Sequence, residues 1–150
     1  MTSIKEGATG LAAQCLAEVA DLHRFFEAWL SGNGAAAGFD RCERALGDGF
    51  AIVDPAGALC ERGPLLSALR AAHGRHAGAD EPFRIWIERP TVRMVHDPVC
   101  LVTYEEWQRI GGRTTARLSS ALFRRRPDGP NGVEWLHVHE TWLPGDRVTR

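Results

Sequence analysis

The sequence predicts an α+β domain in which three N-terminal helices pack on a curved, mainly antiparallel sheet that encloses a cavity. Helical periodicity is confined to the first half of the chain, and the second half holds four long strand-like runs joined by short turns. Helices followed by strands are typical of a layout with the helices on one face of the sheet. Long strands twist and coil, so we expect the covered face to be concave and to leave a hollow.

The composition is that of one globular domain, residues 1–150, with a core expected over about 12–143. The chain is 44% hydrophobic with a net charge of -1, so its charge favours neither nucleic acid nor an acidic membrane as a partner. We see no apolar run of membrane-spanning length and no secretory leader. Cys15, Cys42, Cys60 and Cys100 lie apart, without a CxxC pair. They are expected to be reduced thiols in a cytoplasmic protein, not a zinc site.

The first helix is predicted over about residues 10–31, because apolar side chains recur there at spacings of three and four. Its apolar stripe consists of Cys15, Val19, Leu22, Phe26 and Trp29, and Gly32-Asn33-Gly34 ends it. A second, short helix is marked by Phe39, Cys42 and Leu46.

A short hairpin is expected next, from a strand at 50–53, a turn at Asp54-Pro55-Ala56-Gly57 and a return strand at 59–62. Gly63-Pro64 then opens the third helix, since proline is favoured in the first turn. The buried face of that helix consists of Leu65, Leu66 and Leu69.

Four long strands fill the rest of the chain, over about residues 83–95, 98–110, 113–126 and 133–143. The turns between them are His96-Asp97-Pro98, Gly111-Gly112 and the segment from Pro127 to Gly132. Short turns between long strands indicate an antiparallel meander. Pro90 indicates a bulge or an edge position in the first of these strands.

The last strand carries two chemically different faces, because side chains alternate along a strand. One face consists of Leu136, Val138, Glu140 and Trp142, and the other of Trp135, His137, His139 and Thr141. The first face is apolar apart from one carboxylate, so we expect it to point toward the helices. The face with the two imidazoles is then expected to point outward.

The chain resembles the nuclear transport factor 2-like superfamily over roughly residues 12–143. The resemblance is carried by Leu22-His23-Arg24-Phe25-Phe26, by the hairpin from Phe123 to Trp135 and by the closing Trp135-Leu136-His137-Val138-His139. The superfamily includes ketosteroid isomerase and the association domain of calcium/calmodulin-dependent kinase II, and the chain is most similar to small bacterial members of unassigned function. The resemblance implies a cone-shaped fold and a homodimer through the convex sheet face, but no single activity.

Asp54 is the first candidate for catalysis. In ketosteroid isomerase an Asp-Pro-x-Gly segment supplies the general base, and Asp54 stands at the matching position. That enzyme also needs a tyrosine and a protonated aspartate as oxyanion donors, where this chain has phenylalanines on the first helix and serines on the penultimate strand. Losing such donors is costly, so steroid isomerase activity is not expected. The alternative is that Asp54 only opens a turn.

Glu140 is the second candidate, because its position predicts a carboxylate that points into the cavity. We expect Arg117 and Glu105 to join it in a polar floor beneath Trp107 and Trp142. The predicted ligand-binding residues are Phe26, Trp29, Glu105, Trp107, Arg117, Ser119, Val138 and Trp142. The alternative is a structural ion pair that plugs the cavity.

The outward face is predicted to form the homodimer interface, from Tyr104, Trp135, His137 and His139. Two imidazoles two residues apart could share a metal ion, but neither His96 nor Glu106 stands at a spacing that supplies a third ligand. No metal or cofactor is therefore expected.

Three functions stay open at this point. The favoured one is a small-molecule-binding domain with an apolar cavity and a polar floor. A second is a cofactor-independent isomerase, lyase or hydrolase that acts on a small carbonyl compound through Asp54 or Glu140. The third is a dimerisation module without catalysis.

Overall fold

The computed structural model describes residues 2–148. The helices are α1 (Thr2–Ser31), the 3-10 turn η1 (Ala36–Phe39), α2 (Asp40–Ala45), α3 (Arg62–Ala71), the 3-10 turn η2 (Pro130–Gly132) and α4 (Gly145–Val148). The strands are β1 (Leu46–Val53), β2 (Leu59–Glu61), β3 (Arg84–His96), β4 (Val99–Ile110), β5 (Arg113–Arg125) and β6 (Val133–Trp142). Within this part of the chain, no helix is both long enough and apolar enough to cross a membrane.

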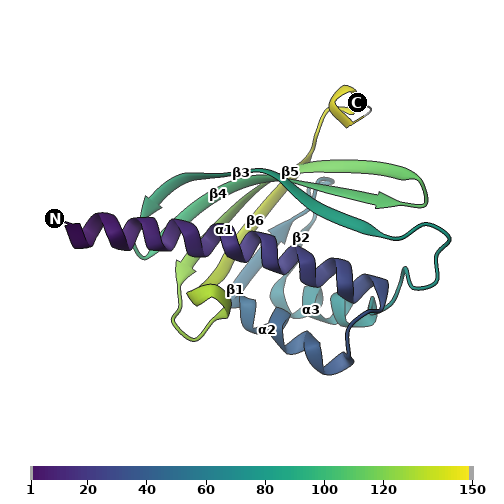
Figure 1. Ribbon diagram of the computed structural model, residues 1–150, viewed down its shortest axis with the longest axis horizontal. Helices are drawn as coiled ribbons and strands as arrows, with labels where there is room; N and C mark the ends of the chain where they lie inside the picture. Colours follow the sequence, from purple (N-terminus) through teal and green to yellow (C-terminus); the bar gives the residue numbers. More distant parts are fainter. Residues whose placement is uncertain (1, 149–150) are drawn as a thin grey trace.

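One sheet holds all six strands, in the order β2-β1-β6-β5-β4-β3. Within residues 2–148 only β1 and β6 pair in parallel, and the segment from β3 to β6 is the predicted antiparallel meander. Helix α1 runs along one face of the curved sheet, with α2 and α3 below it, and α4 lies on the opposite side (Figure 1). The predicted α+β cone is confirmed.

Helix α1 supplies the apolar stripe that the sequence predicts. Cys15, Val19 and Leu22 are buried against the sheet in the main core, although the helix begins eight residues before the predicted start. It ends at Gly32, whose φ of 79° only glycine adopts readily, and a Cβ there would lie 3.1 Å from that of Ala77.

The buried carboxylate Glu18 fixes α1 to its neighbours. Arg41 of α2 donates two hydrogen bonds to it, at 2.8 and 2.5 Å, and the side-chain amide of Asn131 donates a third at 3.0 Å. The indole Nε1 of Trp135 donates a fourth, at 2.8 Å. Four donors satisfy this carboxylate fully, which gives it a structural role.

A bulge in β6 overturns one prediction. Phe123 pairs with Trp135 but Leu122 pairs with His137, so Leu136 is an extra residue. The bulge changes the alternation, and Trp135 is therefore only 1% exposed in the core, with its ring centroid 4.4 Å from that of Phe123. The expectation that Trp135 points outward beside His137 is wrong.

The β4–β5 hairpin overturns a second prediction. Gly111 and Gly112 both have positive φ, at 56° and 80°, as a two-residue hairpin turn requires. Ile110 therefore pairs with Arg113, and counting back along the strands places Glu106 opposite Arg117. Glu105 and Trp107 alternate with Glu106, so they point to the convex face, not into the cone.

Candidate functional site

The floor of the cone consists of side chains that lie side by side across neighbouring strands. Val102, Ala121, Val138 and Ile52 form an apolar row. The next row consists of Tyr104, Ser119 and Glu140, and the third of Glu106, Arg117 and Trp142. Directly paired residues lie close enough for their side chains to interact, so the register itself brings these polar groups together.

A cavity of about 210 Å³ lies between this floor and the helices. Its walls are mainly apolar and include Leu22, Phe26, Leu30, Phe50, Ile52, Leu65, Leu69 and Ile85. Its polar end consists of His23, Tyr104, Glu106, Gln108, Arg117 and Glu140. Apolar walls with a few convergent polar groups are typical of a small-molecule site.

Arg117 is shared by two carboxylates at the polar end. Its Nη1 donates a hydrogen bond to Glu140 Oε2 at 2.8 Å, and its Nε lies 3.5 Å from Glu106 Oε2. The indole of Trp142 stacks on the guanidinium, 4.8 Å from ring centroid to Cζ. These contacts hold the arginine in one position, with its charge directed into the cone.

His23 of α1 closes the network from above. Its Nδ1 lies 2.7 Å from the carbonyl oxygen of Val19, and its Nε2 lies 2.8 Å from Glu106 Oε1. A carbonyl oxygen can only accept, so Nδ1 donates to Val19, and the contact between Nε2 and Glu106 Oε1 joins the imidazole to the carboxylate through one hydrogen. Glu106 Oε2 also accepts a hydrogen bond from Gln108 at 2.7 Å.

The two carboxylates of the network, Glu106 and Glu140, have pKa values that are shifted in opposite directions. Burial opposes the ionisation of Glu106, but the hydrogen bond and the charge of His23, together with Arg117, lower its pKa overall. Burial raises the pKa of Glu140, and the negative charge of Glu106 raises it further against the opposing effect of Arg117. Glu106 therefore holds its charge, and Glu140 is the group that exchanges a proton more readily.

Two hydroxyl groups complete the polar end. Burial raises the pKa of Tyr104 well above its usual range, and the nearby Glu106 and Glu140 add to the rise. The nearby Ser119 hydroxyl opposes the rise in the pKa of Tyr104. Ser119 is 1% exposed, and its hydroxyl oxygen has no partner in good hydrogen-bond geometry among the described residues. A buried polar atom without a partner is uncommon and calls for an explanation.

Several predicted ligand-binding residues do lie at the site, and others do not. Phe26, Arg117, Val138 and Glu140 line the cavity, Ser119 lies beneath it, and Trp142 stacks on Arg117. Trp29 lies in the core, with its Nε1 donating to the Leu69 carbonyl oxygen at 2.8 Å. The prediction that Trp29 belongs to the ligand site is therefore wrong.

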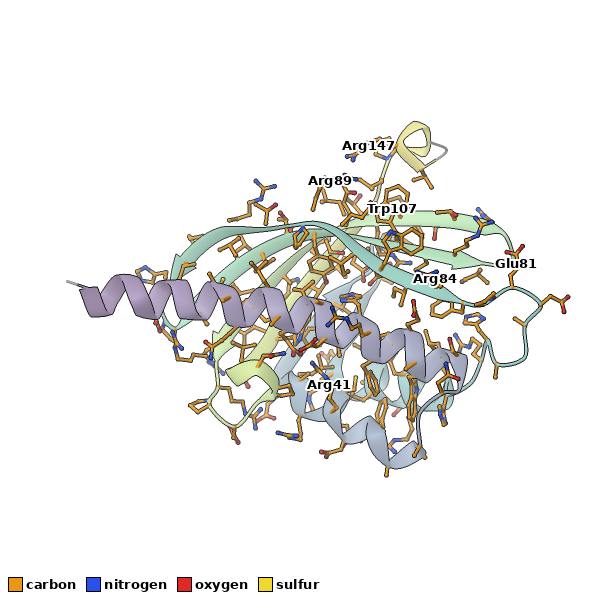
Figure 2. The ribbon with its side chains drawn as sticks, in the orientation of Figure 1. Arg41, Glu81, Arg84, Arg89, Trp107 and Arg147 are labelled. Atoms are coloured by element: carbon orange, nitrogen blue, oxygen red, sulfur yellow. The ribbon has the colours of Figure 1, made fainter. Side chains whose placement is uncertain are left out.

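Glu105 and Trp107 belong to the convex face. Glu105 accepts hydrogen bonds from Arg89 at 2.9 and 2.6 Å and from Trp107 at 3.1 Å, and Arg147 of α4 lies 3.1 Å away. Figure 2 shows Arg89, Trp107 and Arg147 together on the side of the sheet away from α1. The predicted pairing of Glu105 with Arg117 and Glu140 is wrong.

Asp54 lies in the β1–β2 turn, as predicted. Its Oδ1 accepts hydrogen bonds from the backbone N–H groups of Ala56 and Ala58, both at 2.9 Å. These bonds are those of a turn-forming aspartate. The carboxylate still lies near enough to Arg117 to favour the charged form of the guanidinium and contribute to raising its pKa.

The four residues predicted at the dimer interface divide between the two faces. His137 and His139 pair with Leu122 and Ser120 and lie on the convex face. Tyr104 is 3% exposed and lines the cavity, 5.3 Å from His23 between ring centroids. Tyr104 and Trp135 therefore do not lie on the convex face, and their prediction as interface residues is wrong.

Sequence reasoning missed His23, Tyr104, Glu106 and Gln108 as cavity residues. For the three on β4 the signal was present, because a two-residue Gly-Gly turn sets the register of the hairpin. The role of His23 depends on how α1 crosses the sheet, which the sequence pattern does not specify. Its position one residue after the buried Leu22 gave no sign of a cavity-facing imidazole.

The arrangement of α1 over a coiled sheet with a hollow between them is that of a nuclear transport factor 2-like domain, and solved structures agree. An NTF2-like protein of unknown function from Pseudomonas aeruginosa superposes with a TM-score of 0.73 at 22% identity, over 89% of this chain and 99% of that one. The CaMKII hub homology domain of Chlamydomonas reinhardtii gives 0.66 at 20% identity, over 89% and 98%. A putative ketosteroid isomerase from Parabacteroides distasonis gives 0.53 at 15%, over 77% and 81%.

Within this fold class, residues 16–144 match the family described as sucrose-6-phosphate phosphohydrolase C-terminal, and the chain belongs to that family. Sucrose-phosphatase 1 and sucrose-phosphatase 2 of Nicotiana tabacum are each 26% identical to it over 136 residues, which is 85% of this chain. The chain spans only 30% of the length of these curated relatives.

Proposed function

We propose that this domain binds a small molecule in the cone, with an apolar body against α1 and α3 and a polar group at Arg117 and Glu140. The observation that carries the proposal is the unfinished hydrogen bonding at the polar end. Glu18 has four donors and is satisfied, whereas Oε1 of Glu140, a residue that lines the cavity, accepts no hydrogen bond from the described residues. A carboxylate oxygen left unpaired beside a cavity is a feature of a site, because folding alone gains nothing from it.

The size of the cavity supports a ligand of one or two rings. An apolar cavity of about 150 Å³ in another protein binds benzene. The present cavity, at about 210 Å³, is larger. A naphthalene-sized molecule is therefore a suitable test compound.

Titration of the protein with naphthalene and 2-naphthol, followed by calorimetry, tests this function. The variant Leu65→Trp fills the cavity wall with a larger side chain and is expected to weaken binding about tenfold or more. Leu59→Trp is the matched control, because Leu59 is 62% exposed on β2 and does not line the cavity. Absence of binding to the wild type, or equal binding by both variants, would contradict the proposal.

A catalytic role is the second candidate, and the separated pKa shifts of Glu106 and Glu140 favour it. A carboxylate whose pKa is raised exchanges a proton more readily than its ionised neighbour, which keeps Arg117 in position. An isomerase, lyase or hydrolase acting on a small carbonyl compound would use Glu140 in this way. Asp54 is the weaker candidate, since one of its oxygens is engaged in the turn.

We also propose self-association through the convex face, where Leu118 and Met94 are 40% and 53% exposed. The hub homology domain among the similar structures suits this proposal. Four free thiols suit a cytoplasmic location. Neither proposal requires the activity named in the sucrose-phosphatases, which are much longer proteins.

A further inference from the structure

The polar end of the cavity offers one acceptor and several donors to a ligand. Hydrogen bonds from the described residues reach Glu140 only at Oε2, so Oε1 is left as an acceptor. Tyr104 lines the cavity in the same row of the sheet as Glu140 and carries a hydroxyl group that can donate, and Ser119 lies beneath the cavity in that row. Both oxygens of Glu106 already have partners, since His23 contacts Oε1 and Gln108 and Arg117 contact Oε2.

A hydroxyl group complements this set. Its hydrogen can be donated to Glu140 Oε1 while its oxygen accepts from the Tyr104 hydroxyl, and the Ser119 hydroxyl can then donate to the Tyr104 oxygen. One neutral group would thereby engage both Oε1 of Glu140 and the hydroxyl group of Tyr104. We infer that the ligand is an apolar alcohol or phenol, with one hydroxyl group bound between Glu140 and Tyr104. This inference rests on the proposed function.

Other head groups fit the site less well. A ketone or ether oxygen can only accept, so it would lie against Glu140 Oε1 without a hydrogen between them. A carboxylate or phosphate would add negative charge beside Glu106 and Glu140, where Arg117 is already shared by both. The cavity therefore selects against an anion.

A sugar is excluded on different grounds. Its several hydroxyl groups would lie against the walls formed by residues such as Phe26, Ile52 and Leu69, which offer them no hydrogen-bond partner. We therefore do not expect this cavity to bind sucrose, although the relatives are sucrose-phosphatases. The polar atoms gather at one end only.

A series of compounds on one ring system tests the inference by calorimetry at neutral pH. The series is 2-naphthol, 2-methoxynaphthalene, 2-acetonaphthone, 2-naphthoate and naphthalene, with sucrose as the sugar. The ether differs from 2-naphthol by lacking the hydrogen that would be donated to Glu140. We expect 2-naphthol to bind about tenfold to a hundredfold more tightly than the ether, the usual effect of a hydrogen bond to a charged group.

The variant Glu140→Gln tests whether Glu140 accepts the hydrogen bond from the hydroxyl group of the ligand. An amide oxygen is a weaker acceptor than a carboxylate, so the ratio of the two dissociation constants is expected to fall to about threefold. The matched control is Glu134→Gln, since Glu134 is a buried carboxylate of the same strand that pairs with Arg124 and Arg126 and does not line the cavity. The control should keep the wild-type ratio.

The outcomes separate this inference from the proposed function. Binding of all the naphthalene compounds with equal affinity would overturn the hydroxyl assignment and leave the cavity as a ligand site. Tighter binding of the ketone, the carboxylate or sucrose than of 2-naphthol would also overturn it. If none of the compounds bound, the proposed function would fail together with the inference.

Discussion

Glu106 is the residue on which the geometry of the polar end depends. It lies between His23 and Arg117 and receives a hydrogen bond from Gln108, so three elements of the cone meet at one carboxylate. Its ionised form holds the imidazole of His23 and the guanidinium of Arg117 in place.

Replacing Glu106 by glutamine should destabilise the protein by about 3 kcal/mol at neutral pH, because a buried pair that loses one partner leaves a charge uncompensated. The pKa of Glu106 is lowered by folding, so its stabilisation is present above the ordinary value of 4.5 and is lost as the pH falls through the folded value. Urea unfolding should therefore show a gap between wild type and variant that narrows in acid. Glu134→Gln is the control, with a smaller effect, because its arginine partners are largely exposed.

At the scale of elements, the turn between β4 and β5 determines which residues face the cavity. The Gly111-Gly112 turn fixes the pairing of Glu106 with Arg117 and of Tyr104 with Ser119. A shift of one residue would exchange Glu106 for Glu105 and turn the polar end toward the outside. The composition of the site thus follows from two glycines that do not line the cavity themselves.

Substitutions at Gly111 test this control. Its φ of 56° lies in the left-handed region, and a Cβ there would meet no other atom within 4 Å. Asparagine tolerates that backbone conformation, so Gly111→Asn should leave stability nearly unchanged. Gly111→Val should cost about 1–2 kcal/mol in the free energy of unfolding. Equal stability of the two variants in urea would contradict the assigned turn.

The sequence was sufficient for the order of the elements and for the inward position of Val138 and Glu140. The sequence did not predict the correct face of a strand residue where a bulge interrupts the alternation of side chains, or where the register with the neighbouring strand was unknown. The bulge at Leu136 has no glycine or proline to mark it, so Trp135 was placed on the wrong face. Glu105 was predicted to face the cavity in place of Glu106, and the two-glycine turn would have allowed the correct prediction, because it sets the register of the hairpin. Trp29 was placed at the cavity because helical periodicity gives a buried stripe without separating core from cavity wall.

At the scale of the whole molecule, the sheet presents two chemically different faces. The concave face carries the cavity and its charged end. The convex face carries Leu118, which is 40% exposed, next to Ser120 and the imidazoles of His137 and His139. Exposed apolar groups at the centre of a sheet are typical of a surface that pairs with another copy.

Leu118→Asp should weaken self-association about tenfold or more, because a symmetric contact would bring two introduced carboxylates close together. Sedimentation velocity over a range of protein concentrations measures this effect. Leu59→Asp is the control, since Leu59 is exposed on β2 at the sheet edge. A Leu118→Asp protein that sediments like the wild type at every concentration would remove the convex face as the interface.

A crystal structure of the protein soaked with 2-naphthol tests the central claim most directly. We predict two fused rings between α1 and the floor of the sheet, with the oxygen atom within hydrogen-bond distance of Glu140 and Tyr104. Rings bound on the convex face, or rings in the cone with the oxygen directed away from Glu140, would contradict the assignment of this polar end as the recognition site.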